Sequence, residues 1–295
     1  MSAALTLVRR ELWEHRGIFV VVSAIVFSLV VLATLIFGIA VGGGFTAAHP
    51  TGHADTAQVA SLGLGIGAFF YFIYAIAMLF YLSNALYQDR QDKSVLFWRS
   101  LPVSDTATVL AKVGAAALLG PLIVWIAAVA AHLIVLFGLA CVASARGAAG
   151  FSVFSSPLAL FGTWGLLAYA LVVQALWWLP YFGYLLFVSA ASRRVAVLWA
   201  VLPPVIIGLL ELIISHTTYF FSFVAAHFGV SPMFPKGGAV IEIAPGYSHV
   251  GSTPILGNFG WVSHYLAMPS MWIGVGIGAA FLALAVLARR YSATS

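Results

Sequence analysis

The chain has 295 residues, of which 63% are hydrophobic and 7% are charged, and its mean hydropathy is +1.07. Soluble domains carry about 25% charged residues, so this composition excludes a water-soluble globular protein. The net charge of +5 comes from short basic clusters between apolar runs, which favours a membrane topology over a nucleic-acid partner.

The apolar runs are long enough to cross a bilayer as helices, which need about 20 residues each. They predict an all-α integral membrane protein with a single domain, residues 1–295, that forms a six-helix transmembrane domain. The third and fourth runs exceed this length, so we expect them to be tilted, to project into water, or to break near Pro121 and Pro180. The predicted spans are residues 18–41, 62–86, 107–142, 158–190, 195–215 and 269–287.

A short amphipathic segment precedes the first run. Its apolar residues Leu5, Val8 and Leu12 recur at helical spacing, while charged residues occupy the other faces and Trp13 lies near the boundary. This pattern predicts an N-terminal amphipathic interfacial helix, with Gly17 offering a bend before the first span. The alternative is that the segment is only the cytoplasmic end of the first span.

The basic residues are unevenly distributed between the two sides of the predicted membrane domain. Only Arg146 and Lys236 lie on one side, and the other 11 of the 13 lie on the opposite side. Basic loops stay in the cytoplasm, so both termini are predicted to be cytoplasmic. The large segment 216–268 before the last span is then outside. It is too apolar for a free loop and too interrupted by proline and glycine to span, so we expect re-entrant or interfacial helices.

Glycine pairs four residues apart predict close helix contacts, either within the subunit or across a dimer. They are Gly38 and Gly42, Gly63 and Gly67, and Gly274 and Gly278.

Few polar side chains lie inside the predicted spans. His132, Gln174 and Glu211 are the candidates, and Glu211 is close enough to the outer end for a structural or interfacial role. Outside the spans, His49 and His53 have a metal-ligand spacing, but the Pro50 and Gly52 between them disfavour a helix. We therefore predict no metal site.

The predicted cytoplasmic loop 87–106 is the most distinctive stretch outside the spans. Charged residues precede a cluster of apolar and aromatic ones, then Leu101–Pro102 turns the chain before Ser104 and Asp105, which could cap the next helix. A short helix with a charged end and an aromatic patch suits docking to a soluble partner. The alternative is a solvated loop whose aromatic residues rest on lipid headgroups.

The stretch Leu96-Phe97-Trp98-Arg99-Ser100-Leu101-Pro102-Val103-Ser104 resembles the first cytoplasmic loop of ABC type-2 permeases, and the six-span plan agrees. The resemblance implies a bacterial inner-membrane exporter subunit that pairs with a second permease copy or homologue. It also implies a separate ATPase subunit that holds ATP and magnesium, and a drug, antimicrobial peptide or other amphiphile as substrate. The residues implied to couple to the ATPase are Arg90, Asp92, Lys93, Phe97, Trp98 and Arg99.

Motifs for chemistry within the chain itself are lacking. None of its lysines follows a glycine in a phosphate-binding loop, so we expect no ATP binding, no bound cofactor and no enzymatic activity from this chain. The stretch 246–250 departs from the serine-hydrolase elbow, and no zinc-protease motif occurs. The remaining alternatives are an ion-coupled secondary transporter and, within the ABC class, a lipid or polysaccharide exporter.

Overall fold

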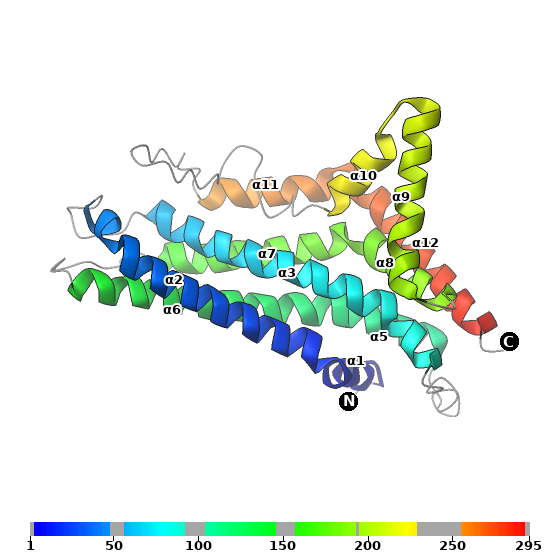
Figure 1. The fold of residues 1–295 in the computed structure, drawn as a ribbon, viewed down its shortest axis with the longest axis horizontal. Coiled ribbons are helices and arrows are strands. Elements are labelled where there is room, and N and C mark those ends of the chain that lie inside the picture. Colours follow the sequence, from blue (N-terminus) through cyan, green and yellow to red (C-terminus); the bar gives the residue numbers. More distant parts are fainter. Residues whose placement is uncertain are drawn as a thin grey trace.

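The computed structural model describes residues 3–47, 56–91, 104–145, 157–192, 195–228 and 255–292. Every regular element in these ranges is helical, as an all-α membrane protein requires. Most helices run side by side along the long axis of the molecule, whereas α9 stands at a steep angle to them (Figure 1). The α-helices are α1 (Ala3–Glu14), α2 (Val22–Ala47), α3 (Thr56–Gln91), α5 (Asp105–Gly114), α6 (Gly120–Ala145), α7 (Pro157–Trp177), α8 (Leu179–Ala191), α9 (Ala196–Ser215), α10 (Tyr219–Phe228), α11 (Ile255–Ala267) and α12 (Pro269–Ser292).

Five helical stretches of the described chain are long and apolar enough to cross a bilayer. They correspond to the second through sixth predicted runs, although the fourth is limited to Leu160–Trp177. The first run is helical over residues 17–47, as a π-helical turn followed by α2, and its apolar stretch Gly17–Ala33 ends where the described side chains are interrupted. The all-helical, multi-pass character is therefore supported, while the six-span count stays a prediction. The five stretches are Leu62–Gln91, Asp105–Val142, Leu160–Trp177, Ala196–Ser215 and Pro269–Tyr291.

The third and fourth apolar runs accommodate their prolines in different ways. The third stays continuous but contains a π-helical turn, Ala115–Leu119, just before Pro121. Proline lacks an N–H and releases a carbonyl in the preceding turn. The Tyr74 hydroxyl donates to the carbonyl of Ala116 in this turn, and the Tyr74 ring lies against Gly120. The fourth run breaks at Trp178, and Pro180 occupies the first turn of the new helix α8. A break was one of the alternatives predicted for the two long runs, and it occurs near Pro180 but not near Pro121.

Helix α8 lies between α3 and α12 in the packed core. Gly183 and Gly278 allow a close contact with α12, because a Cβ on Gly183 would lie 2.5 Å from the carbonyl oxygen of Gly278 and a Cβ on Gly278 would lie 2.7 Å from the carbonyl of Leu179. Gly63 and Gly67 likewise lie against His132 and Leu167 of neighbouring helices. These glycine pairs therefore serve contacts within the subunit, as one of the two alternatives predicted. Gly38 and Gly42 belong to α2, but their surroundings are not described, so the contacts of this pair stay a prediction.

Glu211 fixes the turn between α9 and α10. Its carboxylate accepts hydrogen bonds from the backbone N–H groups of Tyr219 and Phe220, both at 2.8 Å, and from the Thr217 hydroxyl at 2.9 Å. A carboxylate at a helix N-terminus satisfies amides that lack intrahelical partners and suits the helix dipole. Glu211 therefore has the structural role predicted for it.

The described parts of the segment 216–268 contain two short helices, α10 and α11. Helix α11 packs along α7 and also contacts α12. Residues 229–254 lie outside the described ranges, so the re-entrant or interfacial placement of this segment stays a prediction. The same holds for the interfacial position of α1, which is a separate helix joined to α2 through His15 and the π-helical turn Gly17–Val21.

Candidate functional site

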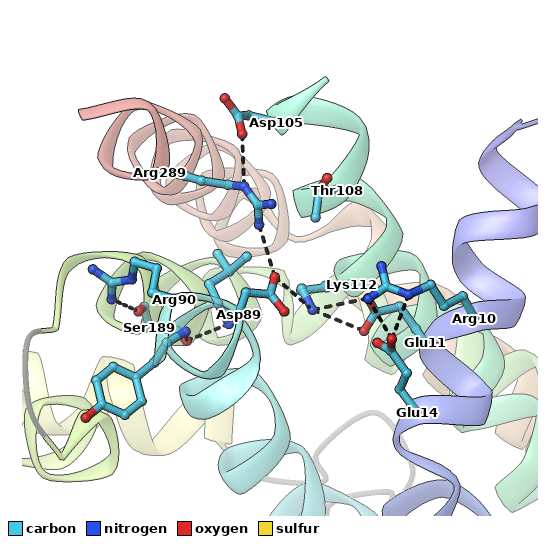
Figure 2. Close-up of polar contacts among 12 residues, drawn as sticks. Arg10, Glu11, Glu14, Asp89, Arg90, Asp105, Thr108, Lys112, Ser189 and Arg289 are labelled. Carbon is cyan, nitrogen blue, oxygen red and sulfur yellow. Dashed lines mark hydrogen bonds and ion pairs between the residues drawn. The ribbon is translucent and has the colours of Figure 1, made fainter. Parts of the chain in front are cut away.

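Five charged side chains meet at the end of the bundle that holds both chain termini (Figures 1 and 2). Lys112 Nζ lies 3.1 and 3.3 Å from the two carboxylate oxygens of Glu11 and 3.5 Å from Asp89. Arg289 contacts Asp89 at 3.2 Å and Asp105 at 2.9 Å. The signs alternate along this chain of contacts. We call Glu11, Asp89, Asp105, Lys112 and Arg289 the ionic cluster.

Helix ends place several of these groups. The Ser104 hydroxyl accepts a hydrogen bond from the Ala107 backbone N–H at 3.1 Å and so caps α5, as the sequence predicted. Asp105 then lies in the first turn of α5, and Arg289 lies near the C-terminus of α12. Each charge has the sign that the dipole of its own helix favours. Their ion pair therefore joins two helix ends that are already suited to those charges.

The ionic cluster holds together the two ends of the segment 92–103. Asp89 lies just before this segment and Asp105 just after it, and Arg289 of α12 contacts both. Asp89 is also linked through Lys112 to Glu11 on α1. A displacement of either end of the segment would therefore act on the first and last helices through direct ion pairs.

Burial makes these contacts matter for stability. The side chains of Lys112 and Glu11 are 1% and 3% exposed. A buried charge costs several kcal/mol to remove from water, so each depends on its counter-ion and hydrogen bonds. The Tyr81 hydroxyl adds a donor to Glu11 at 2.9 Å.

His15 also faces Glu11, with Nε2 3.9 Å from the carboxylate. Burial is the main effect on this imidazole and lowers its pKa, while the attraction of Glu11 opposes the shift and the nearby Lys112 ammonium adds to it. A lowered pKa keeps His15 neutral around pH 7. Lys112 is therefore the group that balances the charge of Glu11.

Arg90 lies beside the ionic cluster and joins α3 to α8. Its guanidinium donates to the carbonyls of Ser189 at 2.7 Å and Ser192 at 2.6 Å, at the end of α8. The Ser189 hydroxyl oxygen in turn accepts from the backbone N–H groups of Leu86 and Tyr87 (Figure 2). Carbonyls at a helix C-terminus lack intrahelical donors, and an arginine satisfies them well.

Arg90 is the one predicted coupling residue in the described part of the chain. Its guanidinium points to α8, so its contribution to partner docking stays a prediction. The others lie outside the described residues: Asp92, Lys93, Phe97, Trp98 and Arg99.

The ionic cluster was not predicted as a unit, although its members carry a recognisable signal. Lys112 falls inside the third apolar run, where a charge is costly without a partner. Glu11 falls on the same short helix as several arginines that are better placed for water. The position of Lys112 required an acid as a partner, but the sequence alone does not say which of the chain's acids it is.

Glu11, Glu14 and His15 also bring three groups that can ligate a metal, two carboxylates and one imidazole, close together. Lys112 and Tyr81 already engage Glu11, and Arg10 engages Glu14 at 2.6 Å. These contacts account for the cluster as ion pairs, and we assign no metal to it.

Polar groups also lie deep in the apolar part of the bundle. His132 Nδ1 accepts a hydrogen bond from Trp164 Nε1 at 3.1 Å, and Gln174 is fully buried. Near the break between α7 and α8, the rings of Tyr71 and Trp178 stack 4.8 Å apart. The Tyr71 hydroxyl and Trp178 indole N–H are buried without a hydrogen-bond partner among the described residues.

The ion pairs and hydrogen bonds described above are the basis for a functional proposal, because comparison with known proteins does not identify a family. No protein-family model, curated protein or solved structure matches the chain.

Proposed function

We propose that the chain is the membrane-spanning permease subunit of an ATP-binding cassette exporter, coupled to a separate ATPase subunit. The observation that carries the proposal is the ionic cluster, in which Arg289 joins the two ends of segment 92–103 and Lys112 links them to α1. A partner bound to this segment could move the first and last helices through these ion pairs without contacting the membrane.

Energy coupling requires two arrangements of the membrane helices whose balance the partner can bias. ATP binding and hydrolysis in the partner would displace segment 92–103, and the buried ion pairs would pass this displacement to α1, α3, α5 and α12. Ion pairs with little exposure suit this role because they resist separation better than solvated ones. Two permease copies would enclose the path for an amphiphile such as a drug or antimicrobial peptide. Lipid or polysaccharide export is the alternative within this class.

The proposal places the ionic cluster and both termini in the cytoplasm of a bacterial cell, with the chain in the inner membrane. We predict that reporters fused at Met1 and at Ser295 both give cytoplasmic signals, because 11 of the 13 basic residues lie on that side. A reporter inserted near Lys236 should give the opposite signal. Termini on opposite faces of the membrane would contradict this topology.

The docking step is tested with Trp98→Ala. A buried aromatic anchor gives large contact area at small entropic cost, and its truncation typically costs on the order of 2 kcal/mol of binding. We expect about a 30-fold weaker association between the permease and its ATPase, measured by co-purification over a concentration series. Neutralising Lys93 at the edge of the same loop should have a smaller effect. Full retention of the ATPase by Trp98→Ala would leave the loop as a solvated connector.

The transmission step is tested separately with Asp105→Asn. This change weakens the link to Arg289 outside the docking segment, and Asp105 is partly exposed, so the chain should still fold. The ATPase should remain bound while substrate-stimulated hydrolysis and transport fall together. If transport is unchanged, the ionic cluster only stabilises the fold and the proposed coupling route is wrong.

A second candidate, an ion-coupled secondary transporter, is favoured by the buried polar groups around His132 and the α7–α8 break. Broken helices and polar side chains within the bilayer are typical of such proteins. Transport by the purified chain in vesicles distinguishes the two. Uptake driven by an ion gradient without any ATPase would favour this candidate and contradict the exporter proposal.

A further inference from the structure

Helix α1 has two chemically different faces. Glu11 points into the protein, where Lys112 and Tyr81 hold it. Arg9, Trp13 and Arg16 are exposed, with Trp13 61% exposed. The His15 N–H to Glu11 carbonyl bond and the right-handed helical conformation of Arg16 continue the helical path past Glu14. Positions 9, 13 and 16 therefore fall on one face, opposite Glu11.

The arginines of α1 differ in their partners. Arg10 pairs with Glu14 one turn later, at 2.6 Å. Arg9 and Arg16 form no ion pair with any acid in the described ranges. The face around Trp13 thus carries two positive charges that the described protein does not balance, while the neighbouring Arg10 is already neutralised.

This face adjoins a surface suited to lipid. Beyond Arg16, exposed apolar side chains recur at helical spacing along the π-helical turn and α2. They form one stripe leading away from Trp13: Val21, Ile25, Leu29, Leu32 and Ile36. A tryptophan at the end of an apolar stripe is typical of the boundary between hydrocarbon and headgroups. Arg9 and Arg16 flank Trp13 on this face and are exposed.

We infer that Arg9, Trp13 and Arg16 form a binding site for the headgroup of an anionic phospholipid. The planar guanidinium groups bind phosphate oxygens, and the indole lies among the glycerol and upper acyl groups. A zwitterionic lipid carries its own cation beside the phosphate, so the two unbalanced arginines favour a lipid with net negative charge. Free phosphate would lack the contribution of the acyl chains along the α2 stripe.

Such a lipid would hold α1 at the membrane surface from its exposed face while Glu11 holds the buried face to Lys112. The lipid and the ionic cluster would thus fix the same helix from opposite sides. This inference concerns lipid binding alone and does not depend on the exporter proposal.

The test compares phosphatidylglycerol with phosphatidylcholine as ligands of the full-length chain purified in detergent. Native mass spectrometry over a lipid titration gives the relative affinity of the two lipids. Each arginine near the surface contributes about fivefold, so Arg9→Gln with Arg16→Gln should lower the preference for phosphatidylglycerol by roughly 25-fold. Arg10→Gln removes the same charge from the same helix, and we expect it to change the preference little because Arg10 is already paired.

Two further measurements separate charge from structure and locate the lipid. Arg9→Lys with Arg16→Lys keeps both charges and should retain most of the preference, whereas a simple loss of α1 would affect both double variants. Brominated phosphatidylglycerol should quench Trp13 fluorescence, taken as the difference between the wild type and Trp13→Phe, more than brominated phosphatidylcholine does.

Three outcomes would overturn the inference. Arg9→Gln with Arg16→Gln could prefer phosphatidylglycerol over phosphatidylcholine as strongly as Arg10→Gln does, which would place the lipid elsewhere. Inorganic phosphate, added at the same total negative charge as the lipid, could displace it. The site would then be one for a free anion. The glutamine double variant could also change the oligomeric state with lipid binding intact, which would make this face an interface between subunits.

Discussion

Replacing Lys112 with Met should lower the free energy of unfolding by about 3–5 kcal/mol, because it leaves the buried Glu11 carboxylate without its counter-ion, whereas Asp89 keeps Arg289. The Lys112 ammonium is within 3.5 Å of both carboxylates and is almost inaccessible to water. Methionine keeps a similar volume, so the effect would come from charge and not from a cavity. Thermal unfolding of the detergent-purified protein, followed by size-exclusion chromatography after heating, measures the loss.

The matched control is Leu110→Ala on the same helix. Leu110 is 55% exposed, and its truncation should change stability by less than about 0.5 kcal/mol. The double variant Glu11→Gln with Lys112→Met should be more stable than Lys112→Met alone, since it removes the acid together with its partner. Equal stability of Lys112→Met and Leu110→Ala would mean that the ionic cluster contributes nothing to the fold.

Features governed by local sequence were predicted well. The helical class follows from apolar runs that can satisfy their backbone only as helices in a bilayer. The break near Pro180 and the Ser104 cap follow from a missing N–H and a well-placed hydroxyl, which act within one helical turn. The structural use of Glu211 likewise depends on residues fewer than ten positions away.

The ionic cluster could not be predicted in the same way, because its contacts join distant parts of the chain. Lys112 and Glu11 are 101 residues apart, and Arg289 and Asp89 are 200 apart. Their meeting depends on the register of four helices at one end of the bundle, which periodicity does not determine. Lys112 does interrupt the third apolar run, where a charge is costly without a partner, but the sequence analysis did not single it out.

The helix distortion near Pro121 in the third run also could not be predicted from the sequence. A proline in a long apolar run allows a kink, a break or a π-helical turn. The π-helical turn occurs where Tyr74 of another helix donates to the Ala116 carbonyl. The choice among these outcomes therefore depended on a side chain from a different span.

Gly278→Ala should destabilise the protein by about 1–3 kcal/mol, whereas Gly276→Ala on the same helix should be neutral or slightly stabilising. A Cβ on Gly278 would lie 2.7 Å from the carbonyl carbon and oxygen of Leu179 and 2.8 Å from the nitrogen of Pro180. These are backbone atoms at the start of α8, so they cannot rotate away as a side chain would. A Cβ on Gly276 meets nothing within 4 Å.

The variants Gly278→Ala and Gly276→Ala also test whether the packing of α8 against α12 sets the position of the ionic cluster. Gly278 and Arg289 are both on α12, about 16 Å apart along the axis at the usual rise per residue. Pushing α12 away from α8 would move Arg289 relative to Asp89 and Asp105, so Gly278→Ala should lose thermal stability and, if the exporter proposal holds, also the substrate-stimulated activity of the proposed ATPase partner. Gly276→Ala should keep both. If the two variants unfold at the same temperature, close packing at Gly278 is dispensable, and the position of Arg289 must be set at the end of the bundle alone.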